Sequence, residues 1–139
     1  MQNDINNAIL DVVRACDAAV VALCGGDYPD ARHMSNAMNR AADDLTLNFM
    51  TSRTTRKFDQ IMHNNHCCLY FFDANTRHAV RLYGDLIAVT DIKTRRAKWN
   101  PEYSKFGYSG PDDGDFVLLQ FAPKSYKYYV GPEMKTGAL

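Results

Sequence analysis

Residues 45–51, Leu-Thr-Leu-Asn-Phe-Met-Thr, contain the clearest strand pattern in the chain. Leu45, Leu47 and Phe49 recur at every second position, and side chains two residues apart lie on one face of a strand. This spacing predicts a strand with one buried face. Directly after it, the basic residues 53–57 begin a short helix that Thr54 is expected to cap.

Short strands joined by tight turns are expected on both sides of this segment. Further strands are predicted over residues 18–24, 31–38, 67–72, 79–90, 116–121 and 125–130. An amphipathic helix is predicted over residues 4–14, and a helix interrupted by Pro101 over residues 92–102. Gly84 predicts a bulge or a sharp bend in its strand. Phe58, Ile61 and Met62 are expected to face inward from the short helix that follows Thr54.

Helices do not alternate with strands throughout the chain, which argues against a parallel doubly wound sheet. The expected fold is mainly β with flanking helices, an antiparallel β-barrel with the helices packed outside it. A length of 139 residues with 46% hydrophobic and 23% charged residues suits one globular domain, residues 1–139.

Charge and targeting signals narrow the class of partner. Sixteen basic residues balance sixteen acidic ones, which argues against a dedicated nucleic-acid or membrane-surface binder. The longest apolar run, residues 18–24, is far shorter than the roughly 20 residues that cross a bilayer. The N-terminus lacks the basic region of a secretion signal. A cytoplasmic location is therefore expected.

Neither the cysteines nor the histidines show the spacing of a metal site. The four cysteines contain no C-x-x-C pair, so buried thiols in a reducing compartment are expected. His63 and His66 are three residues apart, but no cysteine or acid nearby completes a tetrahedral set, and no metal is expected. The spacing also supports no catalytic triad, no pair of catalytic carboxylates and no P-loop, so the catalytic residues stay unknown.

The densest local charge lies at residues 53–57, Arg-Thr-Thr-Arg-Lys, which carry three cations and no acid. A helix N-terminus offers unpaired backbone N–H groups and the positive end of its dipole, so this segment is a candidate phosphate site. The alternative is a solvated basic turn. Arg32, on a predicted strand, either forms an ion pair with an aspartate or faces the same anion as Arg56 and Lys57.

Taken in order, these residues resemble a known family. Residues 32–34 (Arg-His-Met), 49–51 (Phe-Met-Thr) and 55–57 (Thr-Arg-Lys) are similar to the R-x-[VM] … T … [ST]-x-K pattern of the pyridoxamine 5'-phosphate oxidase-like FMN-binding split barrels. Further similarity, to that family or to its small general-stress-protein subgroup, lies at residues 80–84, Trp99, 115–118 and 126–129. The resemblance covers residues 5–130 and implies an antiparallel split β-barrel.

The resemblance also implies FMN as the cofactor and assigns roles by position. Because the candidate site at Arg32 and residues 55–57 suits a terminal phosphate, FMN rather than FAD is expected to co-purify. Arg32, Arg56 and Lys57 would contact the FMN phosphate, and Thr55 would donate its hydroxyl. The residues implied to lie along the ribityl chain and the flavin ring are Met34, Ser35, Met50 and Thr51.

The family is dimeric, so a homodimer with FMN at the subunit interface is expected. Trp99 would approach a flavin bound mainly by the other chain. Independently, Tyr126, Tyr128 and Tyr129 cannot all face one side of a strand, so at least one of them points away from the barrel.

The chain departs from the family where the true pyridoxal-phosphate-forming oxidases hold their substrate. Ala37 replaces a substrate-binding lysine, and Ala79 replaces a glutamine that contacts the flavin. The C-terminal segment with an arginine and a histidine is also missing, because the last ones here are Arg96 and His78.

Three functional hypotheses follow. The first is an FMN-dependent oxidoreductase on an unidentified small substrate, with the electron chemistry supplied by the flavin. The second is a flavin-binding module without turnover, such as a storage, sensor or stress protein. The third is a haem-binding relative of the same barrel, which needs a histidine ligand.

Overall fold

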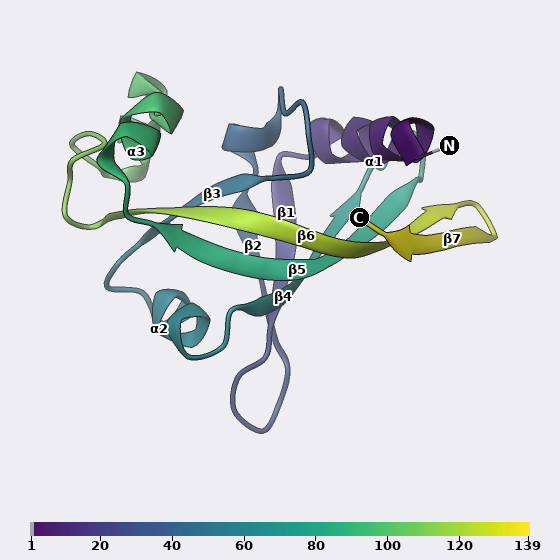
Figure 1. Ribbon diagram of the computed structural model, residues 1–139, viewed down its shortest axis with the longest axis horizontal. Helices are drawn as coiled ribbons and strands as arrows, with labels where there is room; N and C mark the ends of the chain where they lie inside the picture. The colour runs from purple at the N-terminus through teal and green to yellow at the C-terminus, as the bar shows by residue number, and fades with distance from the viewer. Residues whose placement is uncertain (1) are drawn as a thin grey trace.

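Strands dominate the computed structural model, which describes residues 2–139 (Figure 1). The helices are α1 Gln2–Ala15, α2 Arg56–His63 and α3 Ile92–Lys98, with short 3₁₀ segments η1 Ala37–Asn39 and η2 Pro101–Phe106. The strands are β1 Ala18–Leu23, β2 Asp30–Ser35, β3 Asn48–Ser52, β4 His66–Phe72, β5 Ala79–Val89, β6 Phe116–Val130 and β7 Glu133–Ala138.

Seven strands of the described chain form one antiparallel sheet in the order β2-β1-β4-β5-β6-β3, with β7 paired to the end of β6. The two ends of this order, β2 and β3, contact each other but share no ladder. The sheet therefore curls into a barrel that stays open along one seam. This arrangement confirms the expected split barrel.

Strand β6 is continuous, although two separate strands were expected over residues 116–121 and 125–130. Its register against β5 shifts at Gly84, so that Tyr83 faces Ser125 and Gly84 faces Pro123. The bulge absorbs the proline, which has no N–H to donate to a ladder. A Cβ at Gly84 would overlap the Ala122 carbonyl, so the predicted bulge also has a steric reason.

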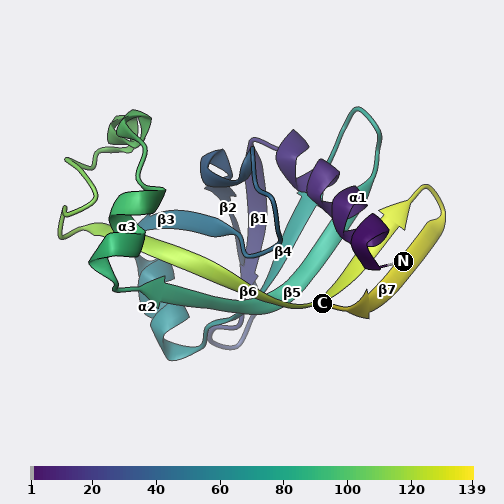
Figure 2. The same ribbon diagram turned by 45° about the horizontal axis from the view of Figure 1, so that its top comes forward.

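The barrel interior holds the apolar core, and α1 closes one end of it. Phe49, Phe71 and Phe121 are fully buried inside. Helix α1 contacts β4 and β5, and Figure 2 shows it lying across that end of the barrel. Ile9 and Val13 of its predicted apolar stripe are fully buried. No helix within residues 2–139 combines the length and apolar character needed to span a membrane.

Three buried asparagines join the seam of the barrel. Asn36 Nδ2 donates to the carbonyls of Val13 (2.8 Å) and Cys16 (2.9 Å), and its Oδ1 accepts from Asn39 Nδ2 (2.9 Å). Asn39 Nδ2 also donates to the Asn48 carbonyl, and its Oδ1 accepts from the Asn48 amide, both at 2.8 Å. The end of α1, the segment after β2 and the start of β3 are thereby fixed to one another.

This network explains two differences from the predicted strands. The strand expected over residues 31–38 ends at Ser35, because Asn36 turns inward to meet α1. The strand expected over residues 45–51 begins only at Asn48, although Leu45 and Leu47 are buried as predicted.

Two predictions for α2 were wrong, and β7 was not predicted. The N-cap is Thr55 rather than Thr54, since the Thr55 side chain accepts a hydrogen bond from the Phe58 amide. Met62 is 61% exposed, whereas Phe58 and Ile61 are buried as expected. Strand β7 follows a turn in which Gly131 has a φ of 57°, a conformation that favours glycine.

Candidate functional site

The site begins where the edge strand β2 meets α2. Arg32 of β2 forms an ion pair with Asp30 Oδ2 at 2.7 Å and donates to Gln60 Oε1 of α2 at 3.0 Å. Gln60 Nε2 in turn donates to Asp30 Oδ2 at 3.0 Å. The three side chains form a closed triangle that holds Arg32 against α2. Of the two alternatives for Arg32, the ion pair with an aspartate is therefore present.

That ion pair does not use all of the Arg32 guanidinium. Its Nη1 atom is buried and has no hydrogen-bond partner within residues 2–139. A buried donor without a partner costs about 1–3 kcal/mol, so such a group is unusual in a protein interior. An acceptor that reached this nitrogen would remove that cost.

Lys57 adds a second cation beside Arg32. Burial lowers the pKa of the Lys57 ammonium below its usual range, and the nearby Arg32 charge lowers it further. Within residues 2–139, no carboxylate forms an ion pair with Lys57 or with the exposed Arg56. We call Arg32, Arg56 and Lys57 the basic cluster. Its local excess of positive charge favours an anion.

The N-terminus of α2 lies in the basic cluster, but Thr55 is already engaged there. Its hydroxyl donates to the Ser52 carbonyl at 2.8 Å and accepts from the Phe58 amide at 3.2 Å. The Thr51 hydroxyl lies 3.3 Å from it. In this arrangement Thr55 caps the helix, and its hydroxyl hydrogen is already donated within the chain. The hydroxyl is therefore not free to donate to a phosphate, which is the role that the resemblance implies.

The rest of the basic run has structural partners. Arg53 Nε donates to the Gly114 carbonyl at 3.0 Å, and the Thr54 amide donates to Asp115 Oδ1 at 3.3 Å. These contacts fasten the loop before β6 to the start of α2. The run at residues 53–57 is thus divided between two tasks, with Arg56 and Lys57 left for a ligand.

The predicted ribityl and flavin contacts lie along β2 and β3 with different exposures. Met34 is 3% exposed and packs in the core, so its side chain does not face solvent. Ser35 is partly exposed, and its Oγ accepts from the Ala37 amide at 3.3 Å. Thr51 is buried, while Met50 is partly exposed.

Trp99 packs in a small apolar cluster away from the main core. Its ring makes edge contacts with Phe116 at 5.2 Å and with Tyr103 at 5.7 Å between centroids. Met50 packs against the same cluster. Met50 and Trp99 therefore pack against one apolar cluster, and β3 runs from Met50 to the segment that begins α2.

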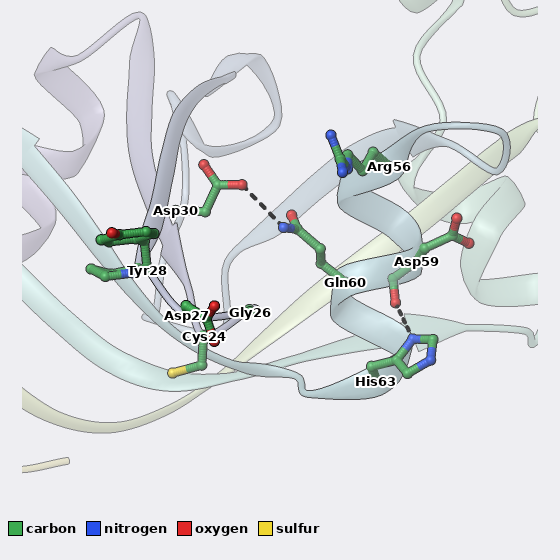
Figure 3. Close-up of a pocket in the computed structure, with 11 residues that line it drawn as sticks. Cys24, Gly26, Asp27, Tyr28, Asp30, Arg56, Asp59, Gln60 and His63 are labelled. Atoms are coloured by element: carbon green, nitrogen blue, oxygen red, sulfur yellow. Dashed lines mark hydrogen bonds between the residues drawn. The ribbon is translucent and has the colours of Figure 1, made fainter.

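An open pocket of about 690 Å³ adjoins the basic cluster. Figure 3 shows it between the loop that follows β1, with Tyr28, and the face of α2 that carries Arg56, Gln60 and His63. Asp30 and Gln60 line it on the side of Arg32. Arg56 thus belongs both to the basic cluster and to the wall of this pocket.

Sequence reasoning missed Asp30 and Gln60 as partners of Arg32. Asp30 lies two residues before Arg32 and so on the same face of β2, a spacing that was available in the sequence. The contact of Gln60 with Arg32 depends on the packing of α2 against β2, which no local sequence pattern predicts. Among residues 2–139, no group of three or more histidine, cysteine or acidic side chains is placed to hold a metal ion.

Comparisons with known proteins agree with this fold. The family model described as "Pyridoxamine 5'-phosphate oxidase like" matches residues 4–139. No curated protein sequence matches the chain. A solved structure from Clostridium acetobutylicum, a protein related to general stress protein 26, has a TM-score of 0.80 at 24% identity and covers 93% of this chain and 90% of its own.

Two other solved structures with a similar fold are cofactor-binding proteins by name. A pyridoxamine 5'-phosphate oxidase-related, FMN binding protein from Nostoc punctiforme has a TM-score of 0.67 at 18% identity, covering 99% of this chain and 95% of its own. A heme binding protein from Mycobacterium smegmatis has a TM-score of 0.71 at 12% identity, covering 94% and 56%. At these identities the likeness concerns the fold.

Proposed function

Because the chain belongs to the pyridoxamine 5'-phosphate oxidase like family, we propose that it binds FMN and serves as an oxidoreductase on a small substrate. The observation that carries the proposal is the basic cluster. Arg32 Nη1 is buried without a partner, and Lys57 is a partly buried cation without an acid. A terminal phosphate offers the acceptors and the charge that both groups lack.

The fit of FMN rests on side chains in two adjoining regions. Arg32, Arg56 and Lys57 would hold the phosphate, and the partly exposed Ser35 and Met50 would border the ribityl chain and flavin ring. The bound flavin would supply the electron transfer. The protein's part is to fix the phosphate, to orient the ring along β3 and to shield one side of it from water.

A homodimer with the flavin at its interface is part of the proposal. Val20 of β1 and Phe72 of β4 are 41% and 42% exposed on the outer face of the sheet. Tyr129 is partly exposed while Tyr126 and Tyr128 are buried, so one tyrosine of this strand does point away from the core. A second copy would cover this apolar surface, and we propose that its Trp99 approaches the flavin.

The chain has cationic side chains that could hold the FMN phosphate, but it lacks the side chains that hold pyridoxamine phosphate in the true oxidases. Ala37 and Ala79 have no group that could hold a substrate phosphate or contact a flavin nitrogen. We therefore propose a substrate other than pyridoxamine phosphate. The four cysteines are free thiols, which supports the proposed cytoplasmic location.

Two measurements on purified protein test the proposal. Fluorescence titration with FMN should show saturable binding, and light scattering at micromolar protein should show a dimer with and without FMN. Bleaching of the bound flavin by NADH or NADPH would support turnover and argue against a passive flavin module. Tight FMN binding by a monomer would refute the shared site, and no FMN binding would refute the proposal as a whole.

A further inference from the structure

The pocket beside α2 lies beyond the phosphate end of the proposed FMN site. Lys57 and Arg32 do not line this pocket, whereas Arg56, Asp30 and Gln60 do. A ligand held only by its terminal phosphate at the basic cluster would therefore leave the pocket free. A group attached to the far side of that phosphate would enter it past Arg56.

Several polar side chains in the pocket form no hydrogen bond or ion pair within the described residues, although the Arg56 charge acts on Asp30 and helps to lower its pKa. Within residues 2–139, no hydrogen bond or ion pair involves the side chains of Asp27, Arg56 or Asp59. His63 is partly engaged, because its Nδ1 lies 2.8 Å from the Asp59 carbonyl. A carbonyl accepts, so the neutral ring carries its proton on Nδ1 and leaves Nε2 as an acceptor.

The pocket also presents an aromatic ring that has little role in the fold. Tyr28 is 82% exposed on the loop between β1 and β2. Gly26, with a φ of 63°, and Pro29 shape that loop on either side of the ring. In Figure 3, Tyr28 lies on the loop side of the pocket and His63 on the helix side. An exposed aromatic ring at a pocket edge suits a heterocyclic base, which stacks on it.

Charge decides what kind of group this pocket accepts. Asp27, Asp30 and Asp59 outnumber Arg56, and Asp30 is already paired with Arg32. An anionic tail would meet the two unpaired carboxylates. A neutral nucleoside would instead offer them ribose hydroxyls and an amino group as hydrogen-bond donors. Only a phosphate close to Arg56 would find a cation.

We propose that this pocket holds the adenosine monophosphate half of a flavin dinucleotide, so that the chain binds FAD as well as FMN. The inference rests on the proposed function, because it keeps the flavin-side phosphate at Arg32 and Lys57; Arg56, which holds the FMN phosphate with them, would contact the second phosphate when FAD is bound. The second phosphate then lies at Arg56, and the adenine stacks on Tyr28.

Isothermal titration of the wild-type protein with FMN, FAD and riboflavin tests the inference. FAD should bind at least as tightly as FMN. Tyr28→Ala should weaken FAD by about tenfold and leave FMN unchanged, because stacking of a base on an aromatic ring is lost only for FAD. Tyr28→Phe keeps the ring and should keep the FAD affinity, which separates stacking from a disturbed loop.

The outcomes separate this inference from the proposed function. If FMN binds but FAD binds about tenfold more weakly or worse, the pocket does not take the nucleotide half and only this inference fails. Equal losses of FMN and FAD in Tyr28→Ala would also overturn it. If neither flavin binds, the proposed function fails together with the inference.

Discussion

Replacing Lys57 by methionine removes one charge from the basic cluster and keeps the apolar stem that packs beside Arg32. In the wild-type protein burial lowers the pKa of this lysine, and the Arg32 charge lowers it further. Keeping Lys57 charged therefore lowers the stability of the ligand-free protein. Lys57→Met should leave the free energy of unfolding of the ligand-free protein unchanged or slightly higher.

The same substitution should weaken FMN strongly. A hydrogen bond to a charged group contributes about 1.5–3 kcal/mol, and each 1.4 kcal/mol is about tenfold in affinity. The loss of one such bond to the phosphate predicts an FMN dissociation constant about 10- to 100-fold higher. Riboflavin has no phosphate, so its affinity should stay the same.

Fluorescence titration of both flavins against wild type and variant measures this difference. Lys93→Met, on the exposed face of α3, is the matched control and should change neither affinity. Equal losses for FMN and riboflavin would show that Lys57 acts on the fold or on the ring rather than on the phosphate. An unchanged FMN affinity would remove Lys57 from the site.

Three further outcomes are expected. Because the folded-state pKa of Lys57 lies below its ordinary value of 10.5, the unfolded chain binds more protons between the two values. The free energy of unfolding of ligand-free wild type, relative to that of Lys57→Met, should therefore rise as the pH increases through that window. Chemical denaturation of both proteins across alkaline pH measures this difference, and a difference that does not change with pH would contradict the prediction. Asn39→Ala leaves buried groups of Asn36 and Asn48 unpaired and should cost about 2–4 kcal/mol, seen as a lower urea midpoint with an unchanged slope; a loss below about 0.5 kcal/mol would contradict the role of the network. Pyridoxamine phosphate should not be oxidised at a useful rate, because Ala37 provides no partner for its phosphate, and efficient steady-state turnover would disprove this.

The barrel was predictable because its strands carry local signals. Alternating apolar residues predicted β3, and Gly84 indicated the bulge between β5 and β6. The continuity of β6 was not predictable from periodicity, because Pro123 interrupts the pattern and only the bulge in the pairing tolerates it. The start of β3 depended on Asn39, nine residues earlier, whose side chain mimics a strand partner for Asn48.

The candidate site, like the fold, could be predicted only in part. The cations of the basic cluster could be found from the sequence, since charge density and a helix start are local features. The partners of those cations could not, because Gln60 reaches Arg32 only when α2 packs against β2. The predicted N-cap of α2 was wrong by one residue, because Thr54 and Thr55 have equal capping chemistry. The hydrogen bond to the Ser52 carbonyl selects Thr55.

The visible absorption spectrum of freshly purified protein, with mass spectrometry of the chromophore released on unfolding, shows whether the chain carries a flavin. We expect a flavin spectrum and a released flavin that carries phosphate, because Arg32 and Lys57 form a cationic site that suits a phosphate. A haem spectrum, or a colourless protein that binds neither FMN nor FAD when they are added, would contradict it.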